Sequence, residues 1–309
     1  MNDRSTAITA PLGRWSSRIA LFSACLMIVD VGLHRLTSFP TPVALNLFFV
    51  SAAGAGLAIL IALIAFAQIW RRGYKGAGSA TVGILLPVLV LAWPLTFLPA
   101  YLGQPPLNDI TTDWAAPPRF VELAKFRTTG MNPTTYPADR FPPEQKKAHP
   151  DLRTFTIDRS LEETFELVEE AVRKLKWRVA VAEPPVGRSA KSGRLEATDQ
   201  TLVVGFTDDI VVRVEGNASR SRVDVRSASR YGTHDLGQNA ARVRRFLTEL
   251  QTRVDSTSPA AVAGRRSHRA GALVKRLKER DQKKAESRKK LDRAQSSAQR
   301  GRGQKETQR

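Results

Sequence analysis

The chain has 309 residues, and 48 Lys and Arg against 29 Asp and Glu give it a formal net charge of +19. Its 42% hydrophobic content is close to that of globular proteins, which excludes a collagen-like or wholly disordered chain. The single Cys excludes an internal disulfide framework and a cysteine-rich zinc site. High basicity suggests nucleic-acid binding, but the charge is uneven. Residues 256–309 hold 17 basic and 5 acidic groups, whereas residues 103–255 hold 24 basic and 22 acidic groups, so most of the net positive charge lies in the tail.

Residues 1–102 contain three apolar segments, at about 19–35, 43–69 and 80–102. The second and third have no charged residue and are long enough for a helix to cross a bilayer, which takes roughly 20 residues. The first is shorter, contains Asp30 and could instead be a signal-peptide core. The apolar run continues past Cys25 without a convincing cleavage site, so we expect this segment to be retained. The sequence therefore predicts a transmembrane region of three helices.

Basic residues flanking these segments predict the orientation, because cytoplasmic loops carry an excess of Lys and Arg. The loop between the first two segments has only Arg35 and His34. We therefore expect a cytoplasmic N-terminus, with residues 103–309 on the far side. In a bacterium this protein would lie in the inner membrane, with a periplasmic or extracellular domain. The residues that favour a cytoplasmic location are Arg4, Arg14 and Arg18 before the first segment, and Arg71, Arg72 and Lys75 in the second loop.

Residues 103–150 hold nine of the 18 prolines, which predicts an extended, turn-rich segment without long helices. One interpretation is a stiff spacer. Within it, residues 108–113 carry closely spaced carboxylate, amide and hydroxyl groups. Such groups can ligate a hard cation, but they more often form turns and helix caps, which we favour here.

Residues 151–255 show the pattern of an α+β domain. Ser160 and Glu163 form a capping box that opens a helix to about residue 175, and Asp235 and Gln238 open a second helix to about residue 252. The sequence thus predicts an antiparallel sheet packed by two helices. Aligning apolar faces pairs Val212 with Val223, which places Asp209 opposite Arg226. The expected strands are 152–157, 177–182, 194–198, 210–215 and 220–227, with an apolar run at 201–206, a break at 207–209 and a hairpin loop at 216–219.

Three stretches are familiar in their spacing: Gly205-Phe206-x-Asp208-Asp209-Ile210, Val223-Asp224-Val225-Arg226-Ser227-x-Ser229-Arg230, and Asp235-Leu236-Gly237-x-Asn239-Ala240. Together with Asp109-Ile110-Thr111-Thr112-Asp113 upstream, they resemble the domain of unknown function family 1499. The resemblance covers about residues 105–250. It implies a mostly bacterial family whose members are often attached to membrane spans, and it implies no particular activity. The stretch 231–234 and the basic tail depart from the family pattern.

The domain contains six charged residues that are candidates for ligand binding: Asp208, Asp209, Arg213, Arg226, Arg230 and Asp235. Adjacent carboxylates can act as acid and base when their environments separate their pKa values, and arginines can clamp an anion. The structural alternative is that Asp208 and Asp209 form a turn, Arg226 pairs with Asp209, and Asp235 caps a helix. The sequence shows no metal-ligand or nucleophile–base spacing and no Gly-rich phosphate loop. We therefore assign no catalytic residue, metal or cofactor, and favour a protein that is not an enzyme.

The polybasic tail at 256–309 has too few apolar residues to form a core, so it should be disordered or a solvated helix. Outside the cytoplasm its partner would be anionic lipid or an envelope polymer. Nucleic acid would be available only in the cytoplasm, which argues against it. The sequence predicts an integral membrane protein with a non-catalytic envelope-binding or scaffolding domain. The alternative is a membrane-tethered enzyme or anionic-ligand binder that uses Asp208, Asp209 and Arg226.

Overall fold

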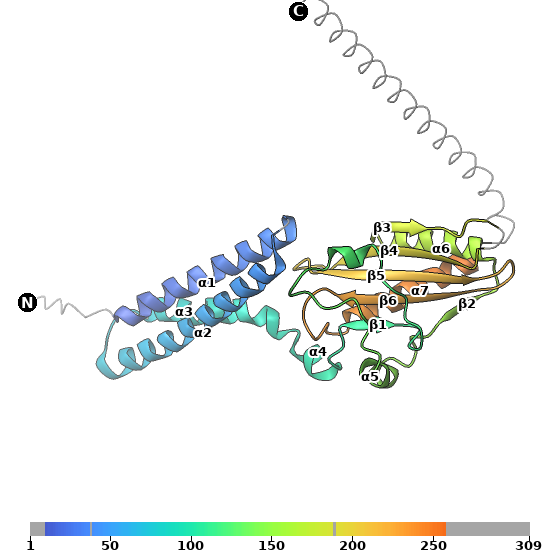
Figure 1. Ribbon diagram of the computed structural model, residues 1–309. Helices are drawn as coiled ribbons and strands as arrows, with labels where there is room; N and C mark the ends of the chain where they lie inside the picture. The colour runs from blue at the N-terminus through green and yellow to red at the C-terminus, as the bar shows by residue number, and fades with distance from the viewer. Residues whose placement is uncertain (1–9, 38, 188–189, 258–309) are drawn as a thin grey trace, which may run out of the picture. The chain divides into compact units, whose positions relative to one another are not determined.

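The computed structural model describes residues 10–37, 39–187 and 190–257 (Figure 1). Within these residues, three helices are long and apolar enough to cross a membrane, as the sequence predicts: Pro11–Leu36, Thr41–Arg72 and the stretch Ala77–Gly103. The first two are α1 and α2, and the third comprises α3 (Ala77–Leu95) and the short α4 (Leu98–Gly103). The N-terminal Arg4 and the tail from residue 258 lie outside the described residues.

The three helices pack through small side chains and expose large ones. Gly83 of α3 lies so close to Ser16 of α1 that an added Cβ would overlap the serine side chain. Trp70 is 91% exposed and Phe22 is 66% exposed. Close approach through small residues is typical of helices packed in lipid, where large apolar side chains face the acyl chains. The buried positions are mostly alanine and serine, including Ser16, Ala20, Ser23, Ala24, Ser51, Ala55, Ala58, Ala62, Ala65 and Ala80.

The helices are followed by an antiparallel sheet with two long helices on one face, which confirms the predicted α+β class (Figure 1). The sheet order is β1-β6-β5-β4-β3, and β2 also pairs with β6. The strands are β1 (Asp109–Thr111), β2 (Phe155–Ile157), β3 (Arg178–Glu183), β4 (Ser192–Gln200), β5 (Thr207–Gly216) and β6 (Ser221–Ser229), and the two helices are α6 (Leu161–Lys174) and α7 (Gln238–Ser256).

The core lies between the sheet and these helices. Alternate residues of β5 and β6 point toward it, and Val212 pairs with Val225 while Val214 pairs with Val223. Ser160 caps α6 by accepting a hydrogen bond from the Glu163 backbone N–H at 3.3 Å, as its sequence predicts. The other apolar side chains of this core include Phe165, Val168, Leu195, Ala197, Ile210, Val243, Phe246 and Leu250.

The predicted register of the β5–β6 hairpin is wrong by two residues. Asp209 lies opposite Ala228, not Arg226, and Arg213 lies opposite Asp224. The cause is the loop: Gly216 still pairs with Ser221, so the turn comprises residues 217–220. The Asn217 side chain accepts hydrogen bonds from the backbone N–H groups of Ser219 and Arg220, which closes the turn one residue later than predicted. A shift of two residues keeps each side chain on its expected face.

The boundary between β4 and β5 also differs from the prediction. Residues 207–209 begin β5 and are not a break, and the apolar run 201–206 is the connection between the two strands. The Thr201 side chain accepts hydrogen bonds from the backbone N–H groups of Gly205 and Phe206, at 3.1 and 2.9 Å. Gly205 has φ of +85°, a conformation that other residues rarely adopt. Local turn chemistry therefore overrides the apolar pattern.

The Pro-rich segment folds as part of the domain and is not a spacer, so the predicted boundary at residue 150 falls inside the domain. Its β1 pairs with β6, and it adds a 3-10 turn, η1 (Leu123–Phe126), and a short helix, α5 (Phe141–Ala148). Phe120 and Leu123 pack with Val211 and Ala228 on the sheet face opposite α6 and α7. The segment therefore covers the second face of the sheet.

Candidate functional site

The adjacent carboxylates Asp208 and Asp209 lie in β5, where successive side chains point to opposite faces of the sheet. Asp208 points toward α7, and its Oδ2 accepts a hydrogen bond from Nη2 of Arg242 at 2.7 Å. Asp209 points to the face that the Pro-rich segment covers, where Arg127 contacts it. The structure thus separates the two groups that an acid–base pair would require side by side.

On the α7 face, Arg242 joins two carboxylates. Its Nε donates to Asp199 at 2.8 Å, its Nη2 donates to Asp208, and its Nη1 donates to Asn239 Oδ1 at 2.7 Å. Burial alone would lower the pKa of this guanidinium, but the charges of Asp208 and Asp199 and their hydrogen bonds raise it. Arg242 therefore stays charged and connects α7 with β4 and β5.

On the opposite face, Asp209 is fully buried between two arginines. Its Oδ2 accepts from Nε of Arg127 at 2.8 Å, and its Oδ1 accepts from Nε and Nη2 of Arg230 at 2.9 and 2.7 Å. Arg127 also donates to the Asn132 carbonyl oxygen at 2.8 Å. Both carboxylate oxygens are thus engaged in holding the loop after η1 against the end of β6.

Arg226 is paired with Asp109 of β1, not with the predicted Asp209. Its Nε and Nη2 donate to the two oxygens of Asp109 at 2.9 and 2.6 Å. Its remaining donors bind the carbonyl oxygens of Pro118 and Thr134, at 3.1 and 2.7 Å. The guanidinium also lies 4.8 Å from the ring centroid of Phe120 and 5.4 Å from that of Tyr136. Each of the three guanidinium nitrogens therefore donates to at least one oxygen of the protein.

Arg213 bridges two carboxylates at the same face. Its Nη2 donates to Asp113 at 2.8 Å and to Asp224 at 3.0 Å. Burial lowers the pKa of Arg213, but the carboxylates of Asp224, Glu215 and Asp113 together raise it. Asp113 also accepts hydrogen bonds from the backbone N–H groups of residues 115 and 116 through Oδ1, which is the turn chemistry that the sequence favours.

Asp235 caps the start of α7. Its two oxygens accept hydrogen bonds from the backbone N–H groups of Gly237 and Asn239, at 2.8 and 2.6 Å. Burial raises the pKa of this carboxyl group, although the two backbone donors oppose the shift. These contacts are those of a helix cap, which is the structural alternative that the sequence analysis gives for Asp235.

Two buried side chains have structural roles that the sequence does not predict. Glu196 accepts hydrogen bonds from the backbone N–H groups of Val121 and Leu123 at 2.8 Å, and so caps η1. The amide of Gln145 bonds to both the N–H and the carbonyl oxygen of Thr111, at 3.1 and 2.6 Å, and so satisfies the free edge of β1. Their partners lie 34 or more positions away in the chain, so no local pattern indicates them.

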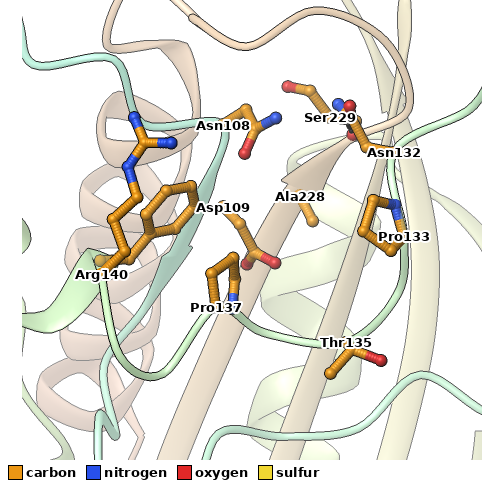
Figure 2. Close-up of a pocket in the computed structure, with 10 residues that line it drawn as sticks. Asn108, Asp109, Asn132, Pro133, Thr135, Pro137, Arg140, Ala228 and Ser229 are labelled. Atoms are coloured by element: carbon orange, nitrogen blue, oxygen red, sulfur yellow. Dashed lines mark hydrogen bonds between the residues drawn. The ribbon is translucent and has the colours of Figure 1, made fainter.

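A cavity of about 150 Å³ lies beside the Arg226–Asp109 pair (Figure 2). Asp109 lines it, and the exposed Arg140 stands at its edge. The six predicted ligand-binding residues are not among those that line it. Among the described residues, no group of three or more His, Cys, Asp or Glu could hold a metal ion. The ten lining residues are Asn108, Asp109, Asn132, Pro133, Thr135, Pro137, Arg140, Phe141, Ala228 and Ser229.

Solved structures similar to part of the chain include the vertebrate conserved region of human METTL16 and the protein TTHA0849 from Thermus thermophilus. Each is 12% identical to this chain, and each match covers 34% of this chain. The matches cover 98% of the METTL16 region and 97% of TTHA0849, with TM-scores of 0.24 and 0.19. The Zhui aromatase/cyclase from a Streptomyces species is 11% identical over 38% of this chain and 93% of its own, with a TM-score of 0.14. Similarities at this level carry no argument about function. No curated protein sequence matches the chain.

The resemblance seen in the sequence is confirmed. The family model described as "Protein of unknown function (DUF1499)" matches residues 109–250. The match begins at β1 and ends in α7, so it includes the Pro-rich segment along with the sheet and helices. Residues 109–250 therefore form a domain that matches the DUF1499 family of proteins of unknown function.

Proposed function

We propose that this protein is anchored in a membrane by its three apolar helices and that its DUF1499 domain is a non-catalytic binding or scaffolding module of the cell envelope. The observation that carries the proposal is the pairing of the candidate charges. Asp208, Asp209 and Arg226 each bind an oppositely charged partner at 2.6–2.8 Å. Catalytic groups must reach a substrate with a free donor or acceptor, whereas these groups are engaged in holding elements of the domain together.

The proposed orientation places the N-terminus in the cytoplasm and the domain outside. It is supported by the basic loop between the second and third apolar helices, which contains Arg71, Arg72 and Lys75, and by the less basic first loop. An extracytoplasmic polybasic tail would meet anionic lipid or an envelope polymer. Both inferences depend on the side of the membrane that the domain occupies.

Reporter fusions after Arg309 test this orientation. A phosphatase that folds only outside the cytoplasm should be active when it is fused at this position. A fluorescent protein that folds only in the cytoplasm should stay dark when it is fused at the same position. The opposite pair of results would place the domain in the cytoplasm and remove the envelope role.

Conservative charge removal separates a scaffold from an enzyme. Asp208→Asn and Asp209→Asn retain side-chain shape but weaken a buried pair, so the comparison is made at the wild-type protein level. At that level a scaffold should still complement a deletion strain. An enzyme that uses either carboxylate would lose complementation at equal protein level. The matched control is Glu215→Gln, which changes a more exposed carboxylate on the same strand.

The cavity favours a second candidate, a site for a small anion. Its volume of about 150 Å³ is enough for about five water molecules, and the exposed guanidinium of Arg140 stands at its edge (Figure 2). Inorganic phosphate and acetate should then raise the thermal unfolding temperature of the purified full chain, and Arg140→Gln should abolish the effect. An equal effect on both proteins would remove this candidate.

A further inference from the structure

One end of the sheet is tethered to the third apolar helix by a short piece of chain. This end, here called the proximal end, is where β4 ends, β5 begins and β6 ends. Asp109 of β1 pairs with Ala228 near the end of β6, so the chain enters the domain there. Five residues separate Asp109 from Gly103, where the third apolar helix stops. Because an extended residue spans at most about 3.6 Å, Asp109 lies within roughly 20 Å of that helix end.

Hydrogen bonds between the proximal end and the apolar helices agree with this tether. His234 follows β6, and its Nε2 lies 3.0 Å from the carbonyl oxygen of Gln104 and 3.2 Å from that of Tyr101. His34 is in the last turn of α1, and its Nδ1 lies 2.7 Å from the carbonyl oxygen of Val204 in the β4–β5 connection. The proximal end therefore lies next to the ends of two helices that are apolar enough to cross a membrane.

The β4–β5 connection at this end exposes apolar side chains from a hydrogen-bonded turn. Leu202 is 86% exposed and Val203 is 48% exposed. The turn is closed by hydrogen bonds from the N–H groups of Gly205 and Phe206 to the Thr201 side chain, so its conformation does not depend on burying these two residues. Contiguous exposed apolar side chains mark a contact surface when they form a larger patch.

Phe126 adds a third exposed apolar side chain at the same end. It is 60% exposed, and its neighbour Arg127 bonds to Asp209 in the first part of β5 and to the Ser229 carbonyl oxygen at the end of β6. Because the adjacent residue Arg127 contacts β5 and β6 at the proximal end, Phe126 also lies at this end.

We propose that Leu202, Val203 and Phe126 insert into the headgroup region of the bilayer that the apolar helices cross. This inference depends on the proposed membrane insertion and adds a second, shallow lipid contact that would hold the domain at the membrane surface. Apolar side chains on the face of a domain that meets the bilayer gain free energy by entering the boundary between headgroups and acyl chains. Arg35 lies at the same place, where its Nη1 donates to Gln200 at 3.2 Å, and would suit anionic headgroups.

A fluorescent probe at residue 202 tests the contact. The only native Cys is replaced by Cys25→Ser, and Leu202→Cys is labelled with an environment-sensitive dye in the full chain. The protein is reconstituted into vesicles of phosphatidylethanolamine and phosphatidylglycerol that contain a lipid with a shallow nitroxide quencher. We expect blue-shifted emission and at least twofold quenching.

Val186→Cys is the matched control. Val186 is 83% exposed in the connection between β3 and β4, at the other end of the nine-residue strand β4. The strand separates the two probes by about 27 Å, so the probe at 186 should show water-like emission and little quenching. Equal signals from the two positions would overturn the proposal. Blue-shifted emission at 202 without quenching would also overturn it, since a protein surface would then cover the residue.

Two further measurements keep the proposal separate from membrane insertion itself. Alkaline extraction reports whether the helices are inserted: release of the protein would refute both proposals, whereas retention with an aqueous probe at 202 would refute only this one. A probe at Phe126→Cys should lose at least half its quenching when Leu202→Asp and Val203→Asp are added. Unchanged quenching would show that the three side chains do not enter the bilayer together.

Discussion

The buried Arg226–Asp109 pair should contribute strongly to the stability of the domain, and Asp109→Asn measures this. Arg226 is only 1% exposed. The asparagine amide keeps the shape of the carboxylate, but its NH₂ group would oppose a guanidinium N–H and leave the buried charge uncompensated. Loss of one partner of a buried pair typically costs about 3–5 kcal/mol. Pro118 and Thr134 still accept from Arg226, so we expect the lower value, about 3 kcal/mol, or more than 100-fold in the unfolding equilibrium.

The assay is brief proteolysis of the full chain in detergent at increasing urea, which reports the unfolded fraction of the sheet domain. The control is Arg222→Gln, on the same strand and face as Arg226, which removes a pair to Glu215 at 2.6 Å that is half exposed. It should cost at most about 1 kcal/mol. The double variant Asp109→Leu with Arg226→Met should recover much of the loss, because it leaves no unpaired charge. The reasoning would be refuted if Asp109→Asn cost no more than Arg222→Gln.

Three further predictions concern other parts of the molecule. Burial and the charge of Arg244 lower the pKa of His149 below its usual 6.5, so below that pH the unfolded state binds a proton that the folded state does not. The free energy of unfolding should therefore fall as the pH drops through 6.5. Urea titrations at several pH values should show a smaller dependence on pH for His149→Gln. Glu196→Gln turns one acceptor at the start of η1 into a donor and should lower the free energy of unfolding by about 2 kcal/mol. Backbone hydrogen exchange should become faster at residues 121–123 and stay unchanged in α6. Gly83→Leu should lower the thermal midpoint of the helix bundle in detergent because its side chain would overlap Ser16, whereas Gly78→Leu, which meets nothing within 4 Å, should leave the midpoint unchanged.

Ion pairs explain how the domain can bury several charged side chains on both faces of its sheet. The sheet has a mainly apolar face against α6 and α7, which also holds the Asp208–Arg242 pair. On the second face Glu196, Asp209, Asp224 and Arg226 are buried. The Pro-rich segment covers this second face and supplies Asp109, Asp113 and Arg127, together with backbone carbonyl and N–H groups. A chain with little regular structure can satisfy such a face because its backbone groups are free to bond to side chains.

Local patterns in the sequence were sufficient for the three apolar helices, α6, α7, most strands and the family. The three apolar helices follow from length and hydrophobicity alone, and α6 follows from its capping box and 3–4 spacing. These features depend on residues within one or two turns of each other. The spacing of the motifs likewise indicates the DUF1499 family without any knowledge of which residues are in contact.

Tertiary structure decided which charges meet. The sequence suggested that Arg226 pairs with Asp209, but a hairpin turn one residue later moves Asp209 opposite Ala228, and the partner of Arg226 comes from Asp109, 117 positions away. It also brought Arg127 to Asp209. Such pairs depend on strand register and on how a Pro-rich segment crosses the sheet, and neither leaves a periodic signal in the chain. The sequence therefore determined the kinds of residue available for a site, while the packing of distant segments decided that these residues neutralise one another.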